Sequence, residues 1–147
     1  MCVLRASGQN FDVRSFLAAS PLPICSAYKK GALRLKWQPD GRRHEESGFA
    51  ADVSEKDFSD LAGQIEDARA FLSDHEAELR RLRTFPGVDW VELNFAIELR
   101  IGTDELAVQS DRFPADLLLA AGTLGVDIVM TTYPPMVPDD STETADS

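Results

Sequence analysis

The most extended pattern in the sequence is a stripe of apolar residues and one histidine between residues 54 and 84, spaced alternately three and four apart. That spacing places them on one side of an α-helix. Ser54, with Asp57 three residues later, matches an N-terminal capping pattern, and Phe85-Pro86-Gly87 ends the segment. We expect a single helix of roughly 28 residues, about 42 Å long at ~1.5 Å per residue. The stripe consists of Phe58, Leu61, Ile65, Ala68, Leu72, His75, Leu79 and Leu82.

A strict alternation follows this stripe. From Val91 to Ile101 every odd position is apolar, and nearly every even position is polar. This period of two predicts a strand with one buried face, about 36 Å long at ~3.3 Å per residue. A compact chain of this length is roughly 38 Å across, so helix and strand are expected to span the molecule and to pack flat against each other. A coiled coil is the alternative, because the stripe also fits a heptad pattern.

Shorter patterns complete the prediction, with turn residues such as Pro39-Asp40-Gly41 between them. The predicted order is β-α-β-β-β-α-β-β-α-β, an α+β fold in which a mostly antiparallel sheet is covered on one face by one long helix plus two short helices. Residues 1–135 are expected to form this single domain, and residues 136–147 a disordered acidic tail. Short strands are expected over residues 2–7, 24–29, 33–37, 49–53, 106–110 and 128–133. Short helices are expected after a cap at either Asn10 or Asp12 and over residues 115–124.

The net charge of -10 is distributed unevenly along the chain. Residues 1–43 contain eight basic and two acidic residues, a net charge of +6, whereas residues 44–147 contain seven basic and 23 acidic residues, a net charge of -16. Two interpretations are open: the two parts lie side by side and neutralise each other, or a local basic patch stays available to a partner. The acidic whole disfavours general binding to nucleic acids, which requires a basic face.

Composition excludes several classes of protein. The longest apolar run, Leu117 to Ala121, is far too short to span a bilayer, and no secretory signal is recognisable. Two cysteines, Cys2 and Cys25, cannot build a disulfide framework or a cysteine metal cage. We therefore expect a cytoplasmic protein without membrane contact and without a cofactor. The absence of the P-loop, Rossmann, G-x-S-x-G and H-E-x-x-H motifs argues against the commonest enzyme classes.

The densest set of polar and aromatic groups lies between residues 28 and 46. Tyrosine, tryptophan and arginine dominate binding hot spots, so this segment is where we expect a recognition surface. His44-Glu45-Glu46 contains metal-ligand types, but no second cluster completes a coordination shell, and a solvated loop is favoured. The predicted binding patch comprises Tyr28, Lys29, Lys30, Trp37, Arg42, Arg43, His44, Glu45 and Glu46.

Three further side chains have both a chemical and a structural interpretation. Cys25 with His44 has the residue types of a thiol–base pair, although no third group orients them in the sequence. Removal of Met1 would make Cys2 an N-terminal nucleophile, but its place in an apolar strand favours packing. His75 is either a pH switch or, as the favoured interpretation, a half-buried histidine with satisfied nitrogens. No catalytic residue and no metal ligand is predicted.

Three segments together resemble a known group of proteins. They are Met1-Cys2-Val3-Leu4-Arg5-Ala6-Ser7-Gly8 with Phe11-Asp12, Glu46-Ser47-Gly48-Phe49 leading to Val53-Ser54, and Gln109-Ser110-Asp111-Arg112-Phe113-Pro114. The arrangement resembles small bacterial hypothetical proteins and, more loosely, the family called domain of unknown function 4279, over residues 1–134. The resemblance implies a stand-alone cytosolic bacterial domain, and it carries no functional residue over to this chain.

Two functional hypotheses follow from the sequence. The first is a non-enzymatic protein-interaction domain, by analogy an immunity-type protein, whose acidic bulk meets a basic partner through electrostatic complementarity. The alternative is a small-ligand binder or an unusual enzyme with a site near residues 38–46. A homodimer joined by sheet edges or by the long helix is a third arrangement.

Overall fold

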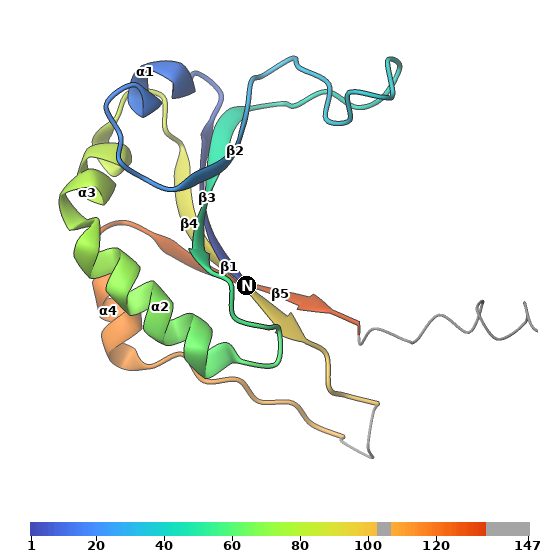
Figure 1. The fold of residues 1–147 in the computed structure, drawn as a ribbon, viewed down its shortest axis with the longest axis vertical. Helices are drawn as coiled ribbons and strands as arrows, with labels where there is room; N and C mark the ends of the chain where they lie inside the picture. The colour runs from blue at the N-terminus through green and yellow to red at the C-terminus, as the bar shows by residue number, and fades with distance from the viewer. Residues whose placement is uncertain (103–106, 135–147) are drawn as a thin grey trace, which may run out of the picture.

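A sheet with helices on one face is the frame of the protein (Figure 1). The computed structural model describes residues 1–102 and 107–134. The predicted α+β class and the mostly antiparallel sheet are confirmed. In this part of the chain the elements are β1 (Cys2–Gly8), α1 (Val13–Leu17), β2 (Ile24–Tyr28), β3 (Ser47–Ser54), α2 (Leu61–Asp74), α3 (Glu76–Thr84), β4 (Trp90–Glu98), α4 (Ala115–Thr123) and β5 (Asp127–Tyr133).

Strand β1 lies at the centre of the sheet, whose order is β2-β3-β1-β4-β5. Neighbouring strands are antiparallel except for β4 and β5, which are parallel and are joined through α4. Leu4 pairs with Ala51 of β3 and with Leu93 of β4, while Arg5 pairs with Glu92. Successive side chains point to opposite faces of a sheet. Leu4, Ala51 and Leu93 therefore belong to an apolar face, and Arg5 and Glu92 to a polar face.

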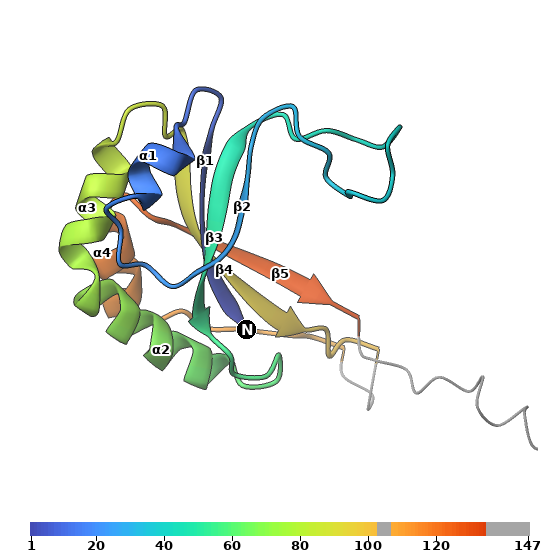
Figure 2. The same cartoon turned by 45° about the horizontal axis from the view of Figure 1, so that its top comes forward.

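The helices lie on the apolar face of the sheet and leave the polar face uncovered (Figures 1 and 2). The odd-numbered residues of β4, from Val91 to Ile97, are at most 1% exposed. Leu72 of α2 and Leu79 of α3 are buried as well, and Leu61 is half-buried. The predicted packing of the helical stripe against the alternating strand is therefore confirmed.

Phenylalanine rings attach α1 to the rest of the core. Phe16 is fully buried, and its ring stacks on Phe49 of β3 at 5.7 Å between centroids and meets Phe85 edge-on at 5.3 Å. Phe11 lies 5.9 to 6.1 Å from these three rings. The Arg81 guanidinium lies 4.1 Å from the centre of the Phe16 ring. Because a helix of five residues is not stable on its own, these contacts hold α1 in place.

The predicted long helix is present as α2 and α3 together, but its predicted start at Ser54 is wrong and it is interrupted at His75. Ser54 ends β3, and its hydroxyl donates to Asp67 Oδ2 at 2.6 Å. The helix begins at Leu61, where Asp60 accepts a hydrogen bond from the Gly63 N–H at 2.9 Å. At His75 the backbone leaves the helical region (φ -115°, ψ 22°), so α2 and α3 are separate helices. The stripe continues across this break because both helices bury the same side.

Several shorter predictions also need correction. Residues 33–37 form no strand, and only an isolated bridge joins Leu33 to Arg43. Strand β4 ends at Glu98, before the predicted Ile101. Residues 107–110 are not a strand, because the Gln109 side chain occupies the backbone groups that a neighbouring strand would use, with its Nε2 donating to Glu98 O at 3.2 Å. The rest of that predicted strand and the predicted tail beyond residue 134 lie outside the described residues.

The lengths of the helices bear on the expectation that the protein has no membrane contact. Within residues 1–102 and 107–134, no helix has the length and apolar character needed to cross a membrane. The longest helix, α2, has 14 residues, and it carries charged residues on its outer side. A bilayer span needs about 20 mainly apolar residues.

Candidate functional site

Residues 29–46, called the arm below, connect β2 to β3 and project away from the helices (Figures 1 and 2). Backbone hydrogen bonds give the arm the form of a hairpin. The Gly31 N–H donates to His44 O at 2.8 Å, and the His44 N–H donates to Ala32 O at 2.9 Å. Farther out, the Arg34 N–H donates to Arg42 O at 2.9 Å. The two sides of the arm are thus tied together, and basic residues from both sides lie on one projection.

A hollow of about 960 Å³, called the cleft below, lies between the arm and the polar face of the sheet. The sheet contributes the floor, with residues from β1, β2, β3 and β4, and the arm contributes the wall. Its lining consists of Arg5, Ser7, Ser26, Tyr28, Ala50 and Trp90 from the strands and Arg34, Arg42, Arg43, His44, Glu45 and Glu46 from the arm.

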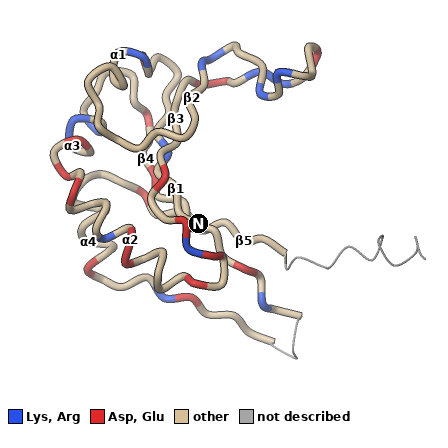
Figure 3. Tube along the Cα trace, in the orientation of Figure 1, with Lys and Arg blue, Asp and Glu red and all other residues tan. Residues whose placement is uncertain are grey.

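The positive charge around the cleft is not neutralised by direct ion pairs. None of the eight basic residues in 1–43 forms an ion pair with a residue of the described part of the chain. The ion pairs that do form use arginines farther along, on α2, on α3 and after β4: Arg69, Arg80, Arg81 and Arg100. Figure 3 shows lysine and arginine gathered along the arm. Of the two interpretations of the charge asymmetry, this arrangement favours the available basic patch.

Aromatic side chains brace the base of the arm against the sheet. The Tyr28 ring stacks on the His44 ring at 4.4 Å between centroids, with 19° between the planes. The Trp90 Nε1–H donates to Glu46 Oε2 at 3.1 Å. One of the two glutamates of the cleft is therefore held by β4, and the stack fixes the imidazole against β2.

At the foot of the arm, position 48 has room only for a glycine. The Tyr28 hydroxyl donates to Ser7 Oγ at 3.2 Å, and Ser7 Oγ in turn donates to Ser47 O at 3.0 Å. A Cβ atom at Gly48 would lie 2.5 Å from the Tyr28 hydroxyl oxygen and 2.4 Å from Ala6 O. Both distances are too short for a side chain, so glycine lets the tyrosine lie flat across β3.

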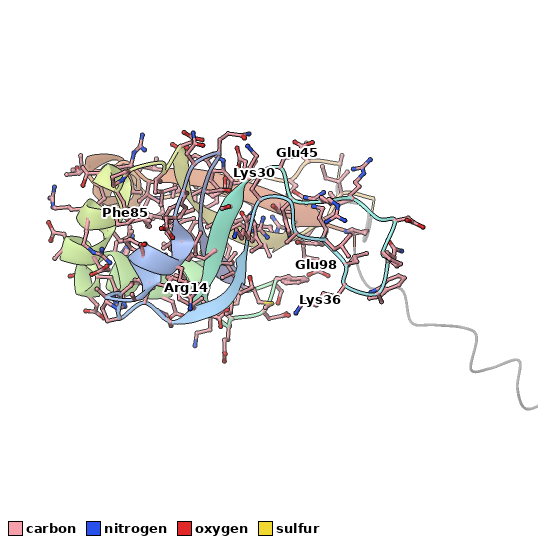
Figure 4. The ribbon with its side chains drawn as sticks, turned by 90° about the horizontal axis from the view of Figure 1, so that it is seen from above. Arg14, Lys30, Lys36, Glu45, Phe85 and Glu98 are labelled. Atoms are coloured by element: carbon pink, nitrogen blue, oxygen red, sulfur yellow. The ribbon has the colours of Figure 1, made fainter. Side chains whose placement is uncertain are left out.

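The structure brings most of the predicted binding patch together. Six of its nine residues line the cleft: Tyr28, Arg42, Arg43, His44, Glu45 and Glu46. The other three do not. Lys29 faces a second hollow beside α1, the backbone N–H of Lys30 donates to Ser47 Oγ at 2.8 Å, and Trp37 is 73% exposed on the outer arm. Figure 4 shows Lys36 and Glu45 on the arm, far from Phe85 on the helical side.

The sequence reasoning missed the half of the cleft that the sheet supplies. Arg5 and Ser7 occupy the polar positions of β1, and Trp90 begins β4. Register places them side by side, because Ser7 pairs with Trp90 and with Gly48. The alternation of residues 2–7 marked Arg5 and Ser7 as one face of a strand. The alternation does not indicate which other strands are the neighbours of β1 in the sheet.

The polar face next to the cleft contains a carboxyl group in an unfavourable environment. Partial burial raises the pKa of Glu92 above the usual value of 4.5. The nearby Arg5 guanidinium acts in the opposite direction, and the Asp127 carboxylate raises the pKa further. Arg5 thus has Glu92 near it on the polar face, whereas the arginines of the arm share the cleft with Glu45 and Glu46 but form no ion pair with the described residues.

The candidate nucleophiles do not form a reactive site. Cys2 is buried, and burial raises the pKa of its thiol to about 12. Cys25 is exposed, lies 3.4 Å from Ala50 O, and does not line the cleft that contains His44. Burial also raises the pKa of the Cys25 thiol, whereas reactive cysteines have a lowered pKa. His75 is half-buried, with its ring 4.6 Å from Phe71.

Metal chemistry finds no support among the described residues. They contain no group of three or more histidine, cysteine, aspartate or glutamate side chains that could hold an ion. The prediction of a solvated loop holds only for Glu45, which is exposed. His44 and Glu46 are partly buried, because the imidazole stacks on Tyr28 and Glu46 accepts from the Trp90 Nε1–H.

The chain matches no protein-family model, no curated protein and no solved structure. The resemblance to the domain of unknown function 4279 family therefore rests on the three sequence segments and stays a prediction. Parts of two of those segments meet at the base of the cleft, where Ser7 pairs with Gly48 and donates to Ser47 O.

Proposed function

We propose that the protein is a non-enzymatic interaction domain whose cleft receives an acidic segment of a partner protein. The observation that carries this proposal is the excess of positive charge around the cleft. Four arginines line it against two glutamates, and the three arginines on the arm form no ion pair with the described residues. Cations gathered along a hollow attract an anionic partner and speed its approach.

Features outside the cleft favour a macromolecule as the partner. On the outer arm, Trp37 is 73% exposed and Leu35 is 46% exposed. Tryptophan, tyrosine and arginine are the residues that most often carry the energy of a protein interface. A partner that fills the cleft would reach these side chains as well, whereas a small molecule would not.

The contacts inside the cleft support binding over catalysis. The Ser7 hydroxyl donates to Ser47 O and accepts from Tyr28, and His44 stacks on Tyr28. A serine nucleophile requires a base at hydrogen-bond distance from its hydroxyl, and Ser7 donates to a backbone oxygen instead. The sequence-based hypothesis of a basic partner concerns the acidic remainder of the chain, which is a different surface, and it stays a prediction.

The proposal is tested with fluorescently labelled octaglutamate and octalysine peptides in an anisotropy titration at low salt. The decisive variant is Arg42→Glu with Arg43→Glu. The matched control is Lys56→Glu with Arg112→Glu, which changes the net charge by the same amount at exposed positions that do not line the cleft. We expect the unmodified chain to bind octaglutamate, and the arm variant to bind it at least about tenfold more weakly.

Salt and the control decide between specific and general attraction. Raising the NaCl concentration to ~1 M, where the screening length is ~3 Å, should remove most of the binding. Preference for octalysine, or an equal loss of affinity in the arm variant and the control, would refute the proposal. In the latter case net charge, and not the cleft, would attract the peptide.

A small anionic ligand is the second candidate, because the volume of the cleft lies within the range of small-molecule sites, about 300–1,000 Å³. A thermal-shift measurement with citrate, pyrophosphate and nucleoside triphosphates separates the two. A ligand that binds the native state raises the melting temperature. A rise that disappears in the Arg42→Glu, Arg43→Glu variant, without any binding of octaglutamate, would favour the small ligand.

A further inference from the structure

A second hollow, called the groove below, lies between α1 and β2 and has a volume of about 940 Å³. Its lining is mainly apolar, in contrast to the cleft. Phe11 is buried beneath it, and Val13 and Leu17 are half-buried along its side. The complete lining is Phe11, Asp12, Val13, Arg14, Leu17, Ala18, Ala27, Tyr28, Lys29 and Ser47.

The groove and the cleft share one wall. Tyr28 lines both hollows, and Lys29, which lines the groove, is the first residue of the arm. Strand β2 is at the edge of the sheet, and among the described residues it pairs only with β3. A chain lying across this edge would therefore contact the cleft on the polar face and the groove on the helical side.

The groove, like the cleft, is lined by positively charged side chains without ion pairs to residues 1–102 and 107–134. Arg14 and Lys29 form no ion pair with the described part of the chain. The acidic residue of the groove, Asp12, is already engaged: its carboxylate accepts from the Ser15 N–H at 3.1 Å and from the Ser15 hydroxyl at 2.7 Å. These bonds cap α1 and lower the pKa of Asp12. An acidic peptide therefore meets two cations beside an apolar floor.

We propose that the partner's acidic segment continues from the cleft over the edge of β2 and inserts one large apolar side chain, a leucine or a phenylalanine, into the groove. This inference rests on the proposed function, because it takes the acidic segment in the cleft as given. It adds a sequence requirement: the partner carries an apolar anchor next to its acidic residues. Burial of the anchor supplies affinity that charge alone does not, and it makes part of the binding insensitive to salt.

The test compares octaglutamate with two longer peptides, in which a leucine–phenylalanine pair is joined through glycine to one end or to the other. All three are titrated by fluorescence anisotropy against the unmodified chain. We expect one extended peptide to bind at least about tenfold more tightly than octaglutamate, as the burial of one large apolar side chain provides. The direction in which the segment lies decides which peptide gains.

Two variants assign that gain to the groove. Leu17→Ser removes apolar surface from its side, and Ala18→Gln fills it from an exposed position where folding is little disturbed. Leu119→Ser, on α4, is the control, because this leucine is 72% exposed and lies outside both hollows. We expect both groove variants to abolish the gain and the control to retain it.

The outcomes separate this inference from the proposed function. If octaglutamate binds but neither extension tightens the binding, the groove takes no anchor, and the proposal for the cleft stands. A gain that persists in Leu17→Ser and Ala18→Gln overturns the inference in the same way. If octaglutamate does not bind at all, the proposed function fails, and the inference fails with it.

Discussion

Replacement of Phe16 by alanine tests whether the aromatic cluster holds α1 on the sheet. Phe16 is fully buried, and its ring lies 5.7 Å from Phe49 and 5.3 Å from Phe85. Truncation of a buried phenylalanine costs about 3–5 kcal/mol in the free energy of unfolding, through lost transfer energy and the cavity left behind. The Arg81 guanidinium, 4.1 Å from the ring centre, loses a cation–π contact of about 0.5–1 kcal/mol at a partly exposed site.

Urea unfolding measures this change. With a slope of about 2 kcal/mol per molar urea, a loss of about 4 kcal/mol lowers the midpoint by about 2 M. The melting temperature should fall by about 10 °C, since a chain of this size loses roughly 2–4 °C per kcal/mol. Tryptophan fluorescence and far-ultraviolet circular dichroism should report the same midpoint if unfolding is two-state.

Two further variants check the reasoning behind this magnitude. Phe16→Leu should lose less stability than Phe16→Ala, because leucine fills more of the cavity. Leu119→Ala should change the free energy of unfolding by no more than about 0.5 kcal/mol, because that side chain is 72% exposed. A loss below about 1 kcal/mol for Phe16→Ala, or an equal loss for Leu119→Ala, would show that the cluster does not hold α1.

Two other predictions concern titratable groups. Because the folded-state pKa of Glu92 is raised, its ionisation destabilises the fold above that pKa, and the cost disappears below the ordinary value of 4.5. Glu92→Gln should therefore raise the urea midpoint at neutral pH but not below pH 4.5, and equal midpoints at neutral pH would contradict this. For the thiols, iodoacetamide followed by mass spectrometry should label exposed Cys25 in the folded protein and buried Cys2 only after unfolding. Labelling of both at one rate in the folded protein would contradict the burial of Cys2.

Periodicity predicted the buried face of the main elements. The odd residues of β4 and the stripe of α2 and α3 are buried as expected, because an amphipathic pattern records which side of an element meets the core. It did not mark where the helix begins. Both Ser54 and Asp60 have capping chemistry, and Ser54 lies in β3 because it pairs with Cys2, a contact between residues far apart in the chain.

Misleading signals at the ends of the main elements have similar causes. Phe58 fits the helical stripe, but it precedes α2 and stacks on Tyr133 of β5 at 5.1 Å. Ile101 fits the alternation of β4, but it is 46% exposed beyond the end of the strand. At both positions the apolar residue fits the periodic pattern, but the backbone is outside the helix or strand that the pattern predicts. A hydrophobic pattern does not report whether the hydrogen bonds of a helix or strand continue, and at Ile101 it does not report burial either.

The candidate site shows the same division. The sequence alone determined that the arm is rich in cations and aromatic residues, because composition is a local property, and six residues of the predicted patch do line the cleft. Only the tertiary structure decided that β1 lies between β3 and β4, which brings Arg5, Ser7 and Trp90 beneath the arm. Strand order depends on contacts between residues that are distant in the chain, and local spacing does not encode it. The arm was therefore recognisable from the sequence, whereas the surface opposite it was not.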